Sequence, residues 1–433
     1  MTRGAFPDLL RLVLLGALIG IPAALISLAF FTAAHYLERF LWTDVPELLG
    51  ASAPPAYLIV GLPVVGALIV AAARIWLPGD GGHSPLHGMA HGPTPVRTVP
   101  GVAVAALGTL GFGLVLGPEA PVMALGSAVG LAAMHLVRAD RRAESVLGLT
   151  GMFAAISTLF GGPLVGGVMV TESGIGLGAK LIPALLPGFV AAAVGYLIFV
   201  GLGPFTGAPP PGLTVPDLEP LNGLTVPDLL IAILVGIATA IVIASVNRAA
   251  SRLGLTGSAR LGTNGRGITV FLVSGGLAVG VIALVAGQLG VDPEDVLFSG
   301  QTSIPAVVAQ TSIASLVILL VAKALAYVVS LASGFRGGPI FPALFLGIGL
   351  ASFAVELLNM PPTLAIAVGA AAGMAAQTRL LVTSMLFAAL LVGSAGADAI
   401  SAIVLATVAA YLTAVAIDPP PEPETAGGPG AAA

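Results

Sequence analysis

Long apolar runs follow one another along almost the whole chain. Each is about 20 residues long without a charge inside it, which is the length a helix needs to cross the hydrocarbon core of a bilayer. The chain therefore predicts an all-α polytopic membrane protein. The runs are Leu12–Leu37, Leu48–Ala73, Thr98–Pro118, Ala120–Val137, Ser145–Thr171, Leu181–Leu202, Leu229–Asn247, Gly267–Val291, Val296–Ala322, Gly337–Val355, Leu357–Thr378, Leu380–Ala397 and Ala399–Ile417.

The composition excludes several other classes of protein. Apolar residues make up 57% of the chain and charged residues only 8%, whereas soluble domains carry about a quarter charged residues. The net charge is −4 without a basic cluster, so we expect no nucleic-acid partner. The chain has no Cys, which excludes disulfides and thiolate metal sites.

We expect one transmembrane domain over residues 1–418. It divides into repeat halves at about 8–206 and 223–418, joined by a Pro/Gly-rich linker at 207–222, and residues 419–433 form a disorder-prone tail. Basic residues before the first run and in the connections at 138–142 and 248–266 favour the cytoplasmic side. Thr225-Val-Pro-Asp228 before an apolar run predicts a helix start.

Gly-Pro breaks interrupt several of the apolar runs. They occur at Gly117-Pro118, Gly161-Gly162-Pro163, Gly337-Gly338-Pro339 and Pro361-Pro362. A break inside a bilayer leaves backbone groups unpaired unless protein or a wet cavity surrounds it. Broken helices of this kind favour a transporter or channel.

Two of these breaks belong to an internal repeat. Gly117–Gly126 aligns with Gly338–Gly347, with Gly, Pro, Pro, Leu and Gly at the same positions. One residue out of that register, Gly151–Ala155 aligns with Gly373–Gln377. Agreement in the same order in both halves indicates a duplication, and we expect two inverted-topology repeats of broken and tilted helices.

The repeated element predicts an anion site. Proline cannot continue a preceding helix and suits the first turn of a following one, so each copy should begin a helix in mid-membrane. Free N–H groups and the positive dipole end at such a start attract anions. Two such starts, one from each half, would converge on one anion near the midplane.

Glu119 lies inside the first copy, in an apolar setting. An ionised carboxylate at this depth is costly, by at least about 2.5 kcal/mol on insertion scales. Among helix N-terminal amides, Glu119 can bind as an anion and compete with the transported one, and protonation would remove that attraction. The alternative is a carboxylate that only caps its own helix.

These residues resemble the CLC family of chloride channels and proton-coupled chloride transporters. Gly117-Pro-Glu-Ala-Pro121 is similar to the family's Gly-Arg-Glu-Gly-Pro element, and Gly337-Gly-Pro-Ile-Phe-Pro342 to its Gly-x-Phe-x-Pro element. Phe160-Gly-Gly-Pro-Leu-Val-Gly166, followed by Glu172, resembles its Phe-Asn-Ala-Pro-Leu-Ala-Gly stretch. The resemblance runs in order from about Leu10 to Leu412.

The resemblance implies a homodimer in the membrane, with one anion pathway in each subunit, and no cofactor. Glu119 would be the gating glutamate, and chloride or a similar small anion the transported ligand, with protons as a second one if transport is coupled. The residues that would bind the anion are Gly117, Ala120, Ser84, Gly338, Ile340 and Phe341. We expect an integral, multi-pass protein of a bacterial inner membrane.

The chain departs from the family pattern at several positions. Pro118 stands where the family has Arg, Ala120 replaces the second Gly, and Pro339 removes an amide N–H. Ser84, in Gly81-Gly-His-Ser-Pro85, matches the family's serine element only out of register. Tyr411 lies before the point where the family places its final tyrosine.

Two further charged residues leave alternatives open. Glu172 could relay protons to Glu119, or could mark a helix end at a wet vestibule. Lys323 could attract anions, or could form a structural ion pair.

Other functions receive less support from the residues. His83, His87 and His91 are spaced four apart, but Pro85 and Gly88 argue against one helical face for metal ligands, and we expect no metal site. No nucleophile or metal pattern predicts an enzyme. The alternatives to a CLC-type transporter are a secondary transporter of another anionic substrate and a transport-inactive scaffold.

Overall fold

The structure is a computed structural model that describes residues 5–87, 93–136, 144–173, 181–206, 215 and 218–419. The expected basic connection at 138–142, most of the linker, nearly all of the tail, Arg3 and His91 lie outside these residues. The described part of the first half forms α1 (Ala5–Arg39), α2 (Val45–Leu48), α3 (Ala56–Trp76), α4 (Val99–Leu110), α5 (Glu119–Leu136), α6 (Glu144–Leu159), α7 (Pro163–Ser173) and α8 (Leu181–Thr206).

The second half is helical as well. It forms α9 (Val226–Leu261), α10 (Gly265–Gln288), α11 (Pro293–Val296), α12 (Ile304–Val308), α13 (Ile313–Ala332), α14 (Ile340–Leu358), α15 (Pro362–Thr378), α16 (Leu381–Val392) and α17 (Ile400–Ile417). Among the described residues, 8 helical segments are long and apolar enough to span a membrane. The polytopic all-α prediction is confirmed.

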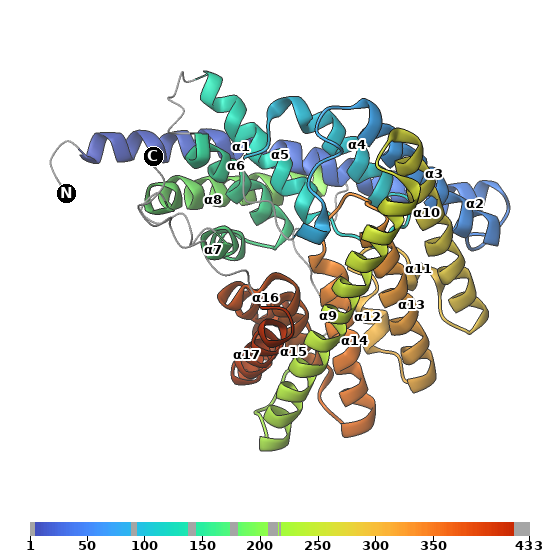
Figure 1. Cartoon of the computed structure of the whole chain (residues 1–433). Helices are drawn as coiled ribbons and strands as arrows, with labels where there is room; N and C mark the ends of the chain where they lie inside the picture. The colour runs from blue at the N-terminus through green and yellow to red at the C-terminus, as the bar shows by residue number, and fades with distance from the viewer. Residues whose placement is uncertain are drawn as a thin grey trace, which may run out of the picture.

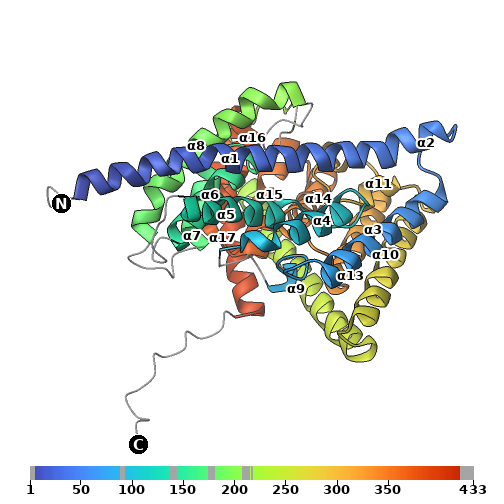
Figure 2. The same cartoon turned by 90° about the horizontal axis from the view of Figure 1, so that it is seen from above.

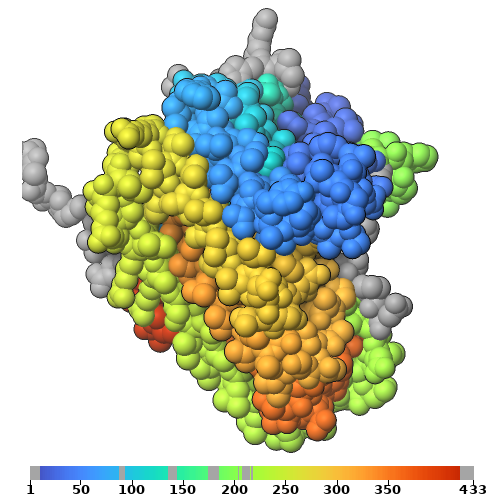
Figure 3. Space-filling model, turned by 90° about the vertical axis from the view of Figure 1, so that its right-hand side faces the viewer, coloured from blue at the N-terminus to red at the C-terminus, as the bar shows by residue number. Residues whose placement is uncertain are grey.

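The helices of each half pack mainly on one another. Figure 2 shows α1 crossing the molecule, where it packs against α4, α5, α6 and α8. In Figure 1, α15, α16 and α17 form one group, and α9 packs against α15 and α17. The halves join where α3 packs against α10 and α7 against α16, and Figure 3 shows the blue first half and the yellow and orange second half meeting on one face.

The predicted breaks begin helices where the prolines require it. Pro118 precedes α5, Pro163 begins α7, and Pro339 is the N-cap residue of α14. Thr225 caps α9 in a capping box with Asp228, as its sequence predicts. The helix starts inside the apolar runs are therefore confirmed.

Several of the expected spans do not correspond to one helix; Ser145–Thr171, for example, contains both α6 and α7. The run Val296–Ala322 is not one helix, because it contains the end of α11, all of α12 and only the first part of α13. The run Thr98–Pro118 ends its helix at Leu110, and Gly113 then adopts a φ of +84° beside the Trp42 ring. Hydropathy alone cannot separate a straight helix from an apolar chain that turns inside protein.

The core is centred on α14. Within its apolar window 72% of the residues are buried, against 33–44% in the other spans. A helix that is buried all round is surrounded by protein and not by lipid. The N-terminus of α14 therefore lies inside the molecule, which a free anion can reach only through a cavity.

Candidate functional site

The two repeated breaks meet in the structure. The Gly117 N–H donates to the Gly338 carbonyl at 2.7 Å, and the Gly338 N–H donates to the Gly117 carbonyl at 2.6 Å. This reciprocal pair satisfies backbone groups that a broken helix would otherwise leave unpaired. It also brings the beginnings of α5 and α14 together, as the repeat predicts.

Glu119 is the first residue of α5, and its side chain reaches across to α14. It is 1% exposed, and its Oε1 accepts the Ile340 backbone N–H at 2.5 Å. Its Oε2 is buried and has no hydrogen-bond partner within the described part of the chain. A carboxylate therefore occupies an anion position at a helix N-terminus, while half of its hydrogen-bonding capacity is unused.

The two glycines provide the space for this carboxylate. A Cβ added to Gly338 would overlap the Glu119 side chain, and one added to Gly117 would overlap Glu119 Oε2. The glycines of the repeat therefore let the Glu119 side chain approach the backbone closely, in addition to breaking the helix.

Aromatic side chains surround the start of α14. The Phe341 ring stacks on Phe160 with centroids 5.6 Å apart, and Phe387 meets Phe160 edge-on at 5.4 Å. The buried Tyr327 hydroxyl donates to the Pro339 carbonyl at 2.8 Å. The sequence analysis missed Tyr327. Its position one helical turn after Lys323 places the two polar side chains on the same face of the apolar α13, and this spacing could have identified it.

A cavity of about 730 Å³ leads toward the start of α14. Its lining includes Pro339, the residue before Ile340, and the basic residues Arg248, Arg252 and Arg379. Arg379 is paired with Asp418 at 2.9 Å. The cavity therefore offers an approach to the α14 start that carries more positive than negative side chains.

Glu172 is placed differently. At the end of α7, its carboxylate accepts the backbone N–H groups of Leu381, Val382 and Thr383 at 2.6–3.1 Å and the Thr383 hydroxyl at 2.7 Å. It thereby caps the N-terminus of α16 from the other half of the chain. Glu172 thus lies at the end of its helix, as one of the two alternatives expects, and a role as a proton relay stays a prediction.

Lys323 is fully buried, and backbone carbonyls hold its ammonium group. Its ammonium donates to the carbonyls of Asp295, Leu297 and Phe298 at 3.0, 2.6 and 3.1 Å and lies 4.8 Å from the Phe345 ring centroid. These groups hold the connection after α11 against α13. Backbone carbonyls satisfy all three donors of the ammonium, and attraction of anions by Lys323 stays a prediction.

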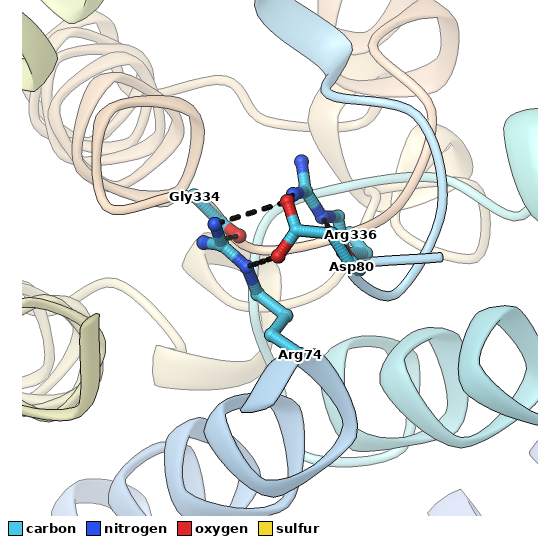
Figure 4. A network of polar contacts seen from close by, with 4 residues as sticks. All are labelled: Arg74, Asp80, Gly334 and Arg336. Carbon is cyan, nitrogen blue, oxygen red and sulfur yellow. Dashed lines mark hydrogen bonds and ion pairs between the residues drawn. The ribbon is translucent and has the colours of Figure 1, made fainter. Parts of the chain in front are cut away.

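Of the remaining predicted residues, Ala120 follows Glu119 in α5 and is half-buried. Ser84 lines a second cavity, of about 680 Å³, whose lining does not include Glu119. The same cavity contains the cluster of Arg74, Asp80 and Arg336 shown in Figure 4, which the sequence analysis missed. Arg336 is a charged residue two positions before the repeated Gly338, and this feature of the sequence could have identified the cluster.

Metal ligands do not gather in the described residues. No group of three or more His, Asp and Glu side chains there is placed to hold a metal ion. Of the set His83, His87 and His91, His91 lies outside those residues.

Comparisons with known proteins agree on one family. The sequence model described as voltage gated chloride channel matches residues 65–415. YfeO of Escherichia coli O7:K1 (strain IAI39) is 28% identical over 351 residues, which cover 79% of this chain and 78% of that protein, and YfeO of Escherichia fergusonii gives the same figures.

The fold is similar to solved structures. A CLC-type fluoride/proton antiporter has a TM-score of 0.72 at 22% identity, and a slow cyanobacterial Cl−/H+ antiporter has 0.75 at 18%. Each comparison covers 94% of this chain and 95% of the other.

Proposed function

Because the chain belongs to the CLC family of voltage-gated chloride channels, we propose that it carries chloride or a similar small inorganic anion, and that Glu119 gates the pathway. It is an integral, multi-pass protein of a bacterial inner membrane. The observation that carries the gating proposal is the buried Glu119 carboxylate, which takes the Ile340 N–H and leaves Oε2 unpaired.

The gating cycle follows from this geometry. Ionised Glu119 occupies the position at the α14 N-terminus where a permeating anion would bind. Protonation removes its charge and its attraction to the Ile340 N–H, so the side chain leaves and an anion takes its place. Anion flux should therefore increase as the pH falls.

The cavity beside Pro339 gives the anion its route to this position. Arg248, Arg252 and Arg379 line it, and a cleft with an excess of one charge raises the local concentration of ions of opposite sign. Phe341, held by its stack on Phe160, keeps the start of α14 in place while Glu119 moves.

We assign the proton step to Glu119 alone. Glu172 already accepts four hydrogen bonds at the start of α16, so its carboxylate is engaged as a helix cap. If transport is coupled to protons, they reach Glu119 by another route. The homodimer remains a prediction, to be checked by the mass of the detergent-solubilised protein.

The deciding experiment is flux from proteoliposomes. An outward chloride gradient is imposed, and chloride release and external pH are recorded for the wild type, Glu119→Gln and the exposed control Glu47→Gln. We expect chloride release in all three, with pH dependence and any proton movement lost only in Glu119→Gln.

Each alternative has its own outcome in this experiment. Unchanged pH dependence in Glu119→Gln would contradict gating by this residue. Proton movement against its own gradient in the wild type identifies an exchanger, and anion flux without it a channel. No flux of chloride or fluoride would favour a transporter of another anionic substrate or a transport-inactive scaffold.

A further inference from the structure

The second cavity is a separate chamber beside the proposed pathway. It encloses about 680 Å³ and is lined by parts of both halves, among them Arg74 at the end of α3, Ser258 of α9, Gly267 of α10 and Arg336 between α13 and α14. It shares Leu86 and Ser251 with the cavity beside Pro339. The two cavities are therefore neighbours, but Glu119 lines neither.

The chamber contains two arginines and one aspartate. Asp80 accepts from Arg74 Nε at 2.8 Å and from Arg74 Nη2 at 3.2 Å. It also forms an ion pair with Arg336 Nη2, and Figure 4 shows its carboxylate between the two guanidinium groups. These are the charged side chains of the chamber lining in the described residues, so the chamber has a net charge of about +1 at neutral pH.

Each of the three guanidinium nitrogens of Arg74 makes a hydrogen bond inside the cluster. Besides its two contacts with Asp80, Arg74 donates from Nη1 to the Gly334 carbonyl at 3.0 Å. Arg336 donates from Nε to the Asp80 carbonyl at 2.9 Å and from Nη2 to the Asp80 carboxylate. Its Nη1 has no hydrogen-bond partner in the described ranges, and Figure 4 shows a terminal nitrogen of Arg336 directed away from Asp80.

Arg336 as a whole is only 5% exposed, but its Nη1 is not one of the buried side-chain atoms without a partner. This nitrogen is therefore accessible from the chamber that Arg336 lines. Burial and the neighbouring Arg74 lower its pKa to about 10, which leaves the guanidinium charged at neutral pH. The chamber therefore presents a charged, preorganised donor without a protein acceptor.

The backbone around the cluster is built to hold this arrangement. Gly79, Asp80, Gly81 and Gly82 all have positive φ, with Asp80 at +50°, a conformation that a non-glycine residue rarely adopts. The contacts of Asp80 with both arginines fix this turn. Arg336 is consequently held in place before any ligand arrives, which reduces the entropic cost of binding.

We propose that this chamber is a second anion-binding site, distinct from the site at the α14 N-terminus, in which a small inorganic anion such as a halide or nitrate accepts from Arg336 Nη1. Arg74 is a positioning residue, because its donors hold Asp80 and Gly334. Asp80 orients Arg336 and lowers the net charge of the chamber. An anion held here lies beside the cavity that leads to Pro339.

The test uses the full-length protein and bromide as the probe. Crystals grown over a series of bromide concentrations give the anomalous peak beside Arg336, and titration calorimetry gives the affinity in solution. The wild type should show a peak within hydrogen-bond distance of Nη1. Arg336→Gln should lose it, with an affinity lower by about tenfold or more, the loss expected for a charge-assisted hydrogen bond.

Asp80→Asn separates an anion site from a purely structural cluster. It raises the net charge of the chamber, so the bromide affinity should increase several-fold, opposite to the effect of Arg336→Gln. Arg336→Lys keeps the charge and should retain part of the binding. Arg266→Gln, an exposed arginine outside the chamber lining, removes the same charge from the protein and should leave the peak unchanged.

The contrary outcomes are equally specific. No peak beside Arg336, at a bromide concentration that fills the α14 site of Glu119→Gln, overturns the proposal. Unchanged bromide affinity in a folded Arg336→Gln protein also overturns it, since Arg336 then does not hold the anion. Glu119→Gln should leave the chamber peak in place, so failure of gating and failure of this site are distinguishable.

Discussion

Glu119 and Glu172 both present a carboxylate to the N-terminus of a helix in the second half, yet their hydrogen bonds differ. Glu119 is almost completely buried and receives one backbone N–H, while its second oxygen has no partner. Glu172 is half-buried and accepts three backbone N–H groups and a hydroxyl. A fully paired carboxylate stabilises a helix start, whereas an incompletely paired one can be displaced by another anion.

The largest expected effect comes from removing the space that Glu119 occupies. In Gly338→Ala, the new Cβ would overlap the Glu119 side chain, so the carboxylate cannot accept from Ile340. We expect anion flux to lose its dependence on pH, as in Glu119→Gln. The measurement is anion flux from proteoliposomes over a range of pH.

Gly61→Ala is the matched control, because a Cβ there meets nothing within 4 Å. It should keep the flux and pH dependence of the wild type. A Gly338→Ala protein with normal pH dependence would show that Glu119 does not gate from this position.

Lys323 extends the comparison to a buried charge that is fully paired. Lys323→Met leaves the carbonyls of Asp295, Leu297 and Phe298 without their donor, which should lower the free energy of unfolding by about 3 kcal/mol. Thermal unfolding in detergent measures this, and the exposed Leu325→Met on the same helix is the control. A large change in anion selectivity without a loss of stability would instead assign Lys323 to the anion pathway.

Glu172→Gln should lower stability by about 2 kcal/mol and leave gating intact. The amide group that replaces one carboxylate oxygen is a donor, and it would face donors at the start of α16. Unfolding temperature and the pH dependence of flux are measured on the same protein, with Glu47→Gln as the exposed control. If the variant stays as stable as the wild type but loses proton movement, Glu172 is a proton carrier and not a cap.

Tyr327→Phe should have the smallest effect, about 1 kcal/mol of stability. It removes the hydrogen bond to the Pro339 carbonyl and keeps the buried ring. The exposed Tyr57→Phe serves as its control in thermal unfolding. A shift in the pH dependence of flux would show that this hydrogen bond also holds the α14 start in its gating position.

The sequence predicted much of the site because its main signals are local. Proline and glycine determine where α5 and α14 begin, and the repeat shows that the two beginnings correspond. Glu119 was identifiable because a carboxylate in an apolar run is expensive. The expected span Val296–Ala322 failed for the opposite reason, since mean hydropathy is equally high in a helix and in an apolar chain that turns inside protein.

By itself, then, the sequence determined a polytopic helical membrane protein with two related helix breaks and one buried glutamate, since these follow from composition, proline chemistry and the cost of burying charge. Only the tertiary structure decided which partners the charges have. Glu172 lies against α16, Lys323 against the connection after α11, and Arg336 against Asp80. These contacts join residues far apart in the chain, and spacing along a sequence carries no information about distances that helix packing alone creates.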